Sequence, residues 1–111
     1  MQRKDILKVS KLDLAGIPCL NARSGFADEK GTVIYYHGWE SNKENNLFLA
    51  KILTFHGYNV ILPDAIHHGE RGALENYNAE ALRSYFWDVI FNSVGEYNAL
   101  IEAAVEKLEI N

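Results

Sequence analysis

The sequence has little cysteine and no long apolar run. Cys19 is the only cysteine, so no disulfide can form within the chain, and a cysteine-based metal site would lack its second thiolate. No apolar stretch approaches the roughly 20 residues of a membrane-spanning helix. Charged residues interrupt the amino-terminal segment and leave no apolar signal-peptide region. We therefore predict a cytoplasmic protein without a membrane partner.

Basic residues are also in the minority. The chain has 11 Lys and Arg against 15 Asp and Glu, which gives a formal net charge of -4. This balance argues against a surface that neutralises nucleic-acid phosphates or anionic lipids, so small molecules are the expected ligands. With 48% apolar residues, the 111-residue chain has the composition of an ordinary globular protein and fits one domain.

Apolar periodicity predicts structure at both ends of the chain. Residues 6–12 and 17–23 alternate in part and are separated by a turn-like segment, so we predict an antiparallel hairpin. After Asn78, a long helix is expected. Gly95 inside this helix costs about 1 kcal/mol relative to Ala, which predicts a close backbone contact. The apolar positions of the helix share one stripe: Trp87, Ile90, Phe91, Val94, Tyr97, Ile101, Ala104, Val105 and Leu108.

Between these ends, the pattern predicts a βαβ unit. Residues 32–36 and 58–62 are apolar on both faces, as in strands of a covered parallel sheet. The intervening helix should begin at Ser41, because Ser41 and Glu44 have the spacing of a capping box, and should end at Gly57. A right-handed crossover would then make the two strands parallel, so the expected fold class is α/β.

Two polar loops follow these strands. The first runs from His37 to Ser41 and the second from Pro63 to Gly72. Open α/β sheets bind ligands at the carboxyl ends of their strands, so a site is expected where the loops meet. Arg71 is expected to form a weak surface pair with Glu70 or Glu75.

The second loop contains a pair of histidines that allows two interpretations. His67 and His68, with Asp64 and Glu70 nearby, could be drawn as a metal site. Adjacent loop residues point in different directions, however, and no spaced third histidine supports a metal. We therefore expect no metal, and we expect Asp64 and His68 to hydrogen-bond backbone groups and hold the loop in shape.

Three segments of the chain occur in an order and spacing that resemble a known superfamily. They are Tyr-His-Gly-Trp-Glu-Ser-Asn-Lys-Glu at 36–44, Gly-Tyr-Asn-Val-Ile-Leu-Pro-Asp at 57–64 and His-Gly-Glu-Arg at 68–71. Together they resemble the α/β-hydrolases, particularly small bacterial esterases of the dienelactone-hydrolase and prolyl-oligopeptidase-like groups. His-Gly alone also fits a plain strand-ending turn, but the three segments alternate correctly with the predicted strands and helix.

The resemblance implies hydrolysis of a small-molecule ester or similar acyl bond, without a cofactor. By its place in the motif, the backbone N–H of Trp39 would be the first donor of an oxyanion hole, which stabilises the charge that develops on the substrate oxygen. Gly38 would let the backbone approach the ligand. His37, Asp64 and His68 would support the loops of this site.

The catalytic triad of the superfamily has no counterpart in the sequence. A glycine-flanked nucleophile, an acid and a histidine would be needed. The nearest approach to such a nucleophile, Ser93, falls in the last predicted helix without a preceding glycine, and we expect it on the helix surface. Cys19 is expected to be a small buried apolar residue. By the family pattern the nucleophile strand would begin near Ile110, so residues 1–111 are expected to form an incomplete domain that is inactive alone.

Two other functions stay open at this point. In the family's sheet order the 32–36 strand would have a long free edge, which could recruit another strand, so the chain could self-associate or act as a non-catalytic module. A complete flavodoxin-like nucleotide-binding domain would need a phosphate-cradling loop, whereas the segment after Tyr36 has one glycine and carries Glu40, which would repel phosphate. The substrate and the kind of nucleophile are not predicted.

Overall fold

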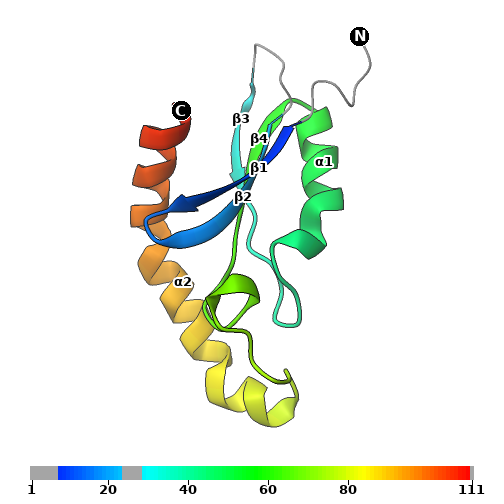
Figure 1. The fold of residues 1–111 in the computed structure, drawn as a ribbon, viewed down its shortest axis with the longest axis vertical. Helices are drawn as coiled ribbons and strands as arrows, with labels where there is room; N and C mark the ends of the chain where they lie inside the picture. Colours follow the sequence, from blue (N-terminus) through cyan, green and yellow to red (C-terminus); the bar gives the residue numbers. More distant parts are fainter. Residues whose placement is uncertain (1–7, 24–28, 111) are drawn as a thin grey trace.

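The computed structural model describes residues 8–23 and 29–110. Figure 1 shows two long helices on opposite sides of a sheet, which gives three layers. The elements are β1 (Lys8–Leu14), β2 (Ile17–Arg23), β3 (Gly31–Ile34), the 3-10 turn η2 (Glu44–Asn46), α1 (Leu47–Phe55), β4 (Tyr58–Pro63), the 3-10 turn η3 (Gly69–Arg71) and α2 (Ala79–Leu108).

The four strands form one mixed sheet in the order β1-β2-β4-β3. β2 pairs antiparallel with both β1 and β4, whereas β3 runs parallel to β4, with Val33 opposite Val60. The predicted hairpin and parallel pair are therefore confirmed, although residues 6 and 7 of the expected first strand lie outside the described residues. β3 ends at Ile34, two residues earlier than expected, and Tyr35 adds one further backbone bond to β4.

Each face of the sheet packs against one helix. Because side chains alternate along a strand, successive residues of β2 and β4 belong to different cores. One core joins the sheet to α2 and contains Leu14, Ile17, Cys19, Ile61, Leu100 and Ala104. The other joins it to α1 and contains Leu20, Ala22, Ala50, Val60 and Leu62. Cys19 is 1% exposed, as expected of a small apolar residue, and burial, followed by the charges of Asp13 and Asp64, raises the pKa of its thiol to about 12.

The start of the first helix differs from the capping-box prediction. Ser41 does not accept a bond from the Glu44 amide, and its hydroxyl instead donates to the Asn42 carbonyl. The Asn42 side chain accepts from the Asn45 amide at 3.0 Å, and the turn η2 precedes α1. The local cap is therefore at Asn42, one residue later than predicted, and the neighbouring Lys43 amide is bound by Asp64. The helix ends as predicted at Gly57, whose φ of +97° is a left-handed value.

The second helix is as long as predicted, but its apolar stripe is not buried as a whole. Leu100 and Ala104 are its only buried residues, whereas Trp87 and Val94 are 61% and 70% exposed. The amino-terminal half of α2 extends past the sheet and has no strand beneath it (Figure 1). The prediction for Gly95 was also wrong, because no described atom lies within 4 Å of the Cβ that a larger residue would place there.

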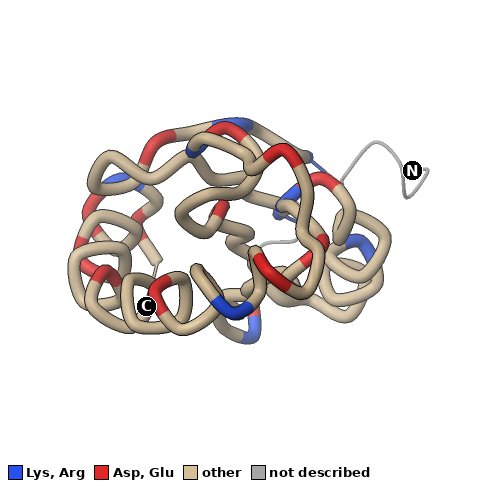
Figure 2. The backbone as a smooth tube through the Cα atoms, turned by 90° about the horizontal axis from the view of Figure 1, so that it is seen from below, with Lys and Arg blue, Asp and Glu red and all other residues tan. Residues whose placement is uncertain are grey.

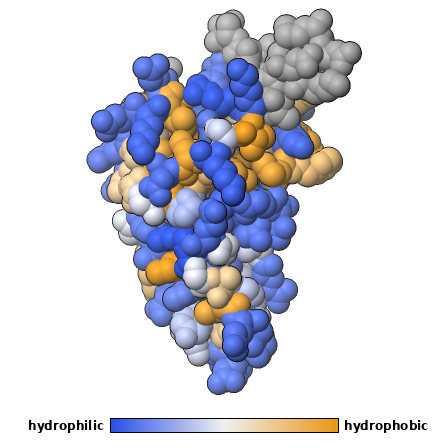
Figure 3. Space-filling model, viewed as in Figure 1, coloured by the Kyte–Doolittle hydropathy of each residue, from blue (hydrophilic) through white to orange (hydrophobic). Residues whose placement is uncertain are grey.

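Polar and apolar side chains are mixed over the face of the molecule that Figure 3 shows, where apolar side chains reach the surface in separate places. Figure 2 shows Lys and Arg positions interspersed with Asp and Glu positions along the backbone. No helix in the described ranges combines the length and the hydropathy needed to cross a bilayer.

β3 lies at the edge of the sheet, as expected, but this edge is shorter than expected. β3 lies at one side of the described sheet, beside β4, and has four residues. An edge this short offers few unpaired backbone groups to another strand. Self-association through this edge stays a prediction.

Truncation of Leu100 tests the packing of α2 on the sheet. Leu100 is 1% exposed in the core with Ile17 and Ile61, so Leu100→Ala should lower the free energy of unfolding by about 2–5 kcal/mol. Val94→Ala, on an exposed position of the same helix, should change it by less than about 0.5 kcal/mol. Urea unfolding of both variants measures this difference, and equal losses would contradict the packing.

Candidate functional site

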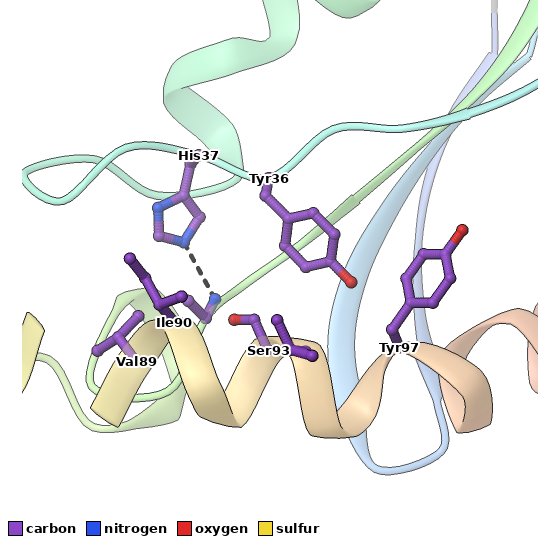
Figure 4. A pocket seen from close by; sticks show the side chains of 8 residues that line it. Tyr36, His37, Val89, Ile90, Ser93 and Tyr97 are labelled. Atoms are coloured by element: carbon purple, nitrogen blue, oxygen red, sulfur yellow. Dashed lines mark hydrogen bonds between the residues drawn. The ribbon is translucent and has the colours of Figure 1, made fainter. Parts of the chain in front are cut away.

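Two loops, residues 35–43 after β3 and residues 64–72 after β4, meet at the carboxyl ends of these strands, and the His37 ring joins them. Its Nε2 accepts a hydrogen bond from the Ala65 amide at 3.0 Å (Figure 4), and its Nδ1 lies 2.9 Å from the Gly38 carbonyl. Because the amide can only donate and the carbonyl can only accept, the ring is neutral and carries its proton on Nδ1. Burial of the ring lowers the pKa of His37, which favours this neutral form.

Trp39 lies in a turn beyond the end of β3, outside the strand ladder. Its indole Nε1 donates to the Tyr77 carbonyl at 3.2 Å, and its own carbonyl is in hydrogen-bond contact with Nε2 of His68. Its ring meets the rings of His68, Tyr77 and Phe86 edge-on. Among the described residues, the Trp39 backbone N–H forms no hydrogen bond.

A buried ion pair fixes the same two loops to each other. The Lys43 and Asp64 residues are each 1% exposed, and Nζ of Lys43 lies 2.6 Å from Oδ2 of Asp64. Oδ1 of Asp64 accepts from the Lys43 amide at 3.0 Å, and Oδ2 also accepts from the Glu70 amide at 3.1 Å. Nζ further contacts Glu70 and Glu44, at 2.9 and 3.1 Å. Sequence patterns did not predict this buried cation, because lysine is among the residues least often buried.

Hydrogen bonding has a larger effect than burial on the pKa values of Lys43 and Asp64. Burial alone would raise the pKa of Asp64 and lower that of Lys43, but the bonds between them and to Glu70 lower the pKa of Asp64 and raise that of Lys43. Both groups therefore keep their charges. Gly69 is required beside them, since it has a φ of +53° and a Cβ there would overlap the Asp64 carboxylate.

His68 and Arg71 attach the second loop to its surroundings. The His68 residue is 0% exposed, and Nδ1 of its ring faces the Ile66 carbonyl at 2.9 Å. Arg71 forms two bonds, of 2.8 and 2.7 Å, with the Glu96 carboxylate on α2. The expected pairing of Arg71 with Glu70 or Glu75 was wrong, because the Glu70 carboxylate contacts Lys43 and α2 brings Glu96 within reach.

A pocket of about 430 Å³ lies between α2 and the two loops. His37 and Tyr36 reach it from the first loop, and Ser93 faces it from α2 (Figure 4). We expected Ser93 on the helix surface, and the structure shows that it is half-buried and lines this pocket. The other lining residues are mostly apolar: Ala65, Val89, Ile90, Val94 and Tyr97.

The two adjacent histidines of the second loop have different surroundings. His68 is buried against Trp39, whereas His67 is half-buried with its ring 4.9 Å from that of Tyr85. Within residues 8–23 and 29–110, no three His, Cys, Asp or Glu side chains come together in an arrangement that could hold a metal ion.

Stability is expected to fall in two steps as the solution is acidified. His37 has a lowered pKa, so its contribution is complete above its ordinary value of 6.5 and is lost as the pH falls through the lowered value. Asp64 also has a lowered pKa, so its contribution is complete above its ordinary value of 3.8 and is lost at still lower pH. The measurement is the free energy of unfolding in urea as a function of pH. His37→Gln should remove the first step and Asp64→Asn the second, and unchanged slopes in both variants would refute the assignment.

Comparison with known proteins gives relatives that are longer than this chain. No family model matches it. YitV of Bacillus subtilis (strain 168), a candidate esterase by its name, is 35% identical over 97 residues, which are 86% of this chain and 37% of YitV. Esterase YjfP of Escherichia coli (strain K12) is 32% identical over 108 residues, which are 92% of this chain and 41% of YjfP. The chain spans less than half the length of either relative.

Solved structures share the architecture. TT1662 from Thermus thermophilus superposes with a TM-score of 0.75 at 22% identity, over 94% of this chain and 43% of that chain. A cold-adapted esterase from an Arctic intertidal metagenomic library superposes with a TM-score of 0.65 at 17% identity, over 91% of this chain and 45% of that chain. Sequence similarity and architecture together show that this chain has an α/β-hydrolase-type fold, and it matches part of the length of each of these proteins.

Proposed function

We propose that this chain forms the oxyanion-binding part of an esterase-like hydrolase, with the Trp39 backbone N–H as the donor. The reaction would be hydrolysis of a small-molecule ester or similar acyl bond, in line with the name of the relative YjfP. One observation carries the proposal. The Trp39 amide has no acceptor among the described residues, while the groups on both sides of it are hydrogen-bonded.

The direction of this N–H is set by the peptide that contains it. The Gly38 carbonyl accepts from Nδ1 of His37 at 2.9 Å and from the Ser41 amide at 3.1 Å. A trans peptide is planar, so the Trp39 N–H points opposite to the Gly38 carbonyl. Holding the carbonyl therefore aims the N–H without any contact to the N–H itself. A donor fixed in this way does not have to reorganise when charge develops on a substrate oxygen.

The surroundings of the donor suit acyl transfer. When a nucleophile attacks an ester carbonyl, an electron pair moves onto the carbonyl oxygen, and one fixed donor there contributes about 3 kcal/mol to the stability of the transition state. The mostly apolar pocket beside His37 could take a small acyl group. His37 itself is not a suitable general base in this arrangement, because its Nε2 lone pair is used by the Ala65 amide.

The chain by itself is expected to be inactive as an esterase. Its sequence contains no glycine-flanked serine, and Ser93 lies within the 30-residue helix α2 and not on a strand-to-helix turn. Purified chain should hydrolyse p-nitrophenyl acetate no faster than buffer. Saturable hydrolysis that disappears in Ser93→Ala would contradict this part of the proposal, since it would make Ser93 a nucleophile.

The donor is tested in an active background. We suggest a chimera in which this chain replaces the matching segment of YjfP, with p-nitrophenyl acetate as substrate. Trp39→Pro removes the N–H and should lower kcat by about 100- to 1,000-fold, whereas Trp39→Ala keeps the N–H and should retain most of kcat.

Proline could disturb the fold of the loop, so a second replacement is needed. Indole-3-lactic acid in place of Trp39 keeps the side chain and exchanges only the N–H for oxygen. It should lower kcat to a similar extent. The proposal fails if the chimera is active and keeps its full kcat with this replacement.

A further inference from the structure

We propose that His68, with a proton on Nε2, is a positioning residue for the oxyanion donor, acting through the hydrogen bond from this nitrogen to the Trp39 carbonyl. This inference rests on the proposed function of the Trp39 amide and adds the residue that sets the position of that amide. His68 would not touch the substrate. Its effect would reach the reaction only through the backbone of Trp39.

Two histidines hold the two peptides that flank Trp39. His37 holds the Gly38 carbonyl, which belongs to the peptide that contains the Trp39 N–H. His68 holds the Trp39 carbonyl, which belongs to the next peptide along the chain. Because each peptide is planar, φ and ψ of Trp39 are the only soft angles between the two planes. Fixing both planes therefore fixes the place of the N–H as well as its direction.

His68 is itself held rigidly, in a closed set of contacts. Its ring is 0% exposed and stacks on the Tyr77 ring, with centroids 4.8 Å apart and planes 20° apart. The Tyr77 carbonyl accepts from the Trp39 indole at 3.2 Å, which completes a triangle of Trp39, His68 and Tyr77. The Tyr77 hydroxyl donates to the His67 carbonyl at 2.7 Å, so Tyr77 is anchored to the same loop as His68.

The two ring nitrogens of His68 allow positioning to be separated from packing. Nε2 faces the Trp39 carbonyl, whereas Nδ1 faces the Ile66 carbonyl within the second loop. The side-chain amide nitrogen of asparagine can occupy the place of Nδ1, and that of glutamine can reach the place of Nε2. His68→Asn should therefore keep the contact within the loop and lose the contact to Trp39. His68→Gln should restore the contact to Trp39.

The direct test uses the 111-residue chain labelled with 15N at tryptophan. The chain has two tryptophans, and Trp87, which is 61% exposed on α2, serves as an internal reference. In a 1H–15N spectrum, His68→Asn should shift or broaden the backbone signal of Trp39, and His68→Gln should return it toward the wild-type position. The Trp87 signals should not change in either variant. A Trp39 signal that stays in place in both variants, or that shifts equally in both, would overturn the inference.

A second pair of variants tests the role of His68 if His68→Asn does not fold. Should His68→Asn fail to fold, which the Trp87 signals would reveal, His68→Gln and His68→Met form a second pair of similar length in which only glutamine has a donor. The Trp39 signal should then be close to wild type in the glutamine variant alone. Equal Trp39 signals in these two variants would overturn the inference.

Kinetics in the YjfP chimera connect His68 to the reaction. His68→Asn should lower kcat by about 10- to 100-fold, as expected for a misplaced catalytic group, with KM nearly unchanged, and His68→Gln should recover most of the loss. A change in KM alone would contradict positioning. The spectra do not depend on catalysis, so a negative result in them contradicts only the inference about His68. An unaffected kcat after removal of the Trp39 N–H would contradict the proposed function itself.

Discussion

The carboxylate of Asp64 is the group on which the arrangement of the two loops depends. It follows directly after β4 and binds the backbone amide and the ammonium of Lys43 in the first loop, and the Glu70 amide in the second. Removing two charges from water costs several kcal/mol per ion, and only a fully hydrogen-bonded geometry offsets that cost. Here both oxygens of the carboxylate are used, and glycine at position 69 leaves the space they need.

The parallel pairing of β3 and β4 explains why these groups can meet. The register places Ile34 opposite Ile61, so the chain leaves both strands at the same edge of the sheet, with His37 shortly after the end of β3 and Asp64 directly after β4. The loops are then joined at three levels. The first is the ion pair of Lys43 and Asp64, the second is the bond between the His37 ring and the Ala65 amide, and the third is the triangle of Trp39, His68 and Tyr77. The Trp39 N–H is left without a partner among the described residues in a backbone that is otherwise fixed.

The sequence was informative where local periodicity determines structure. The hairpin, the parallel pair and the length of α2 follow from alternation and helical spacing, and the meeting of the two loops follows from the rule that parallel strands end at one edge. It was not informative where distant contacts decide. The segment expected to form a cap at Ser41 is instead capped by Asn42 and bound to Asp64 through the Lys43 amide, and Arg71 paired with Glu96 from α2. Helical spacing also cannot tell which part of α2 lies over the sheet.

The proposed role of the Trp39 amide is to bind an oxygen that gains negative charge. A crystal structure of the YjfP chimera, with its nucleophile modified by a phosphonate ester, tests this role most directly because the phosphoryl oxygen imitates that oxygen. We expect this oxygen about 2.7–3.1 Å from the backbone nitrogen of Trp39. A phosphoryl oxygen bound by other donors, with the Trp39 N–H directed away from it, would contradict this role.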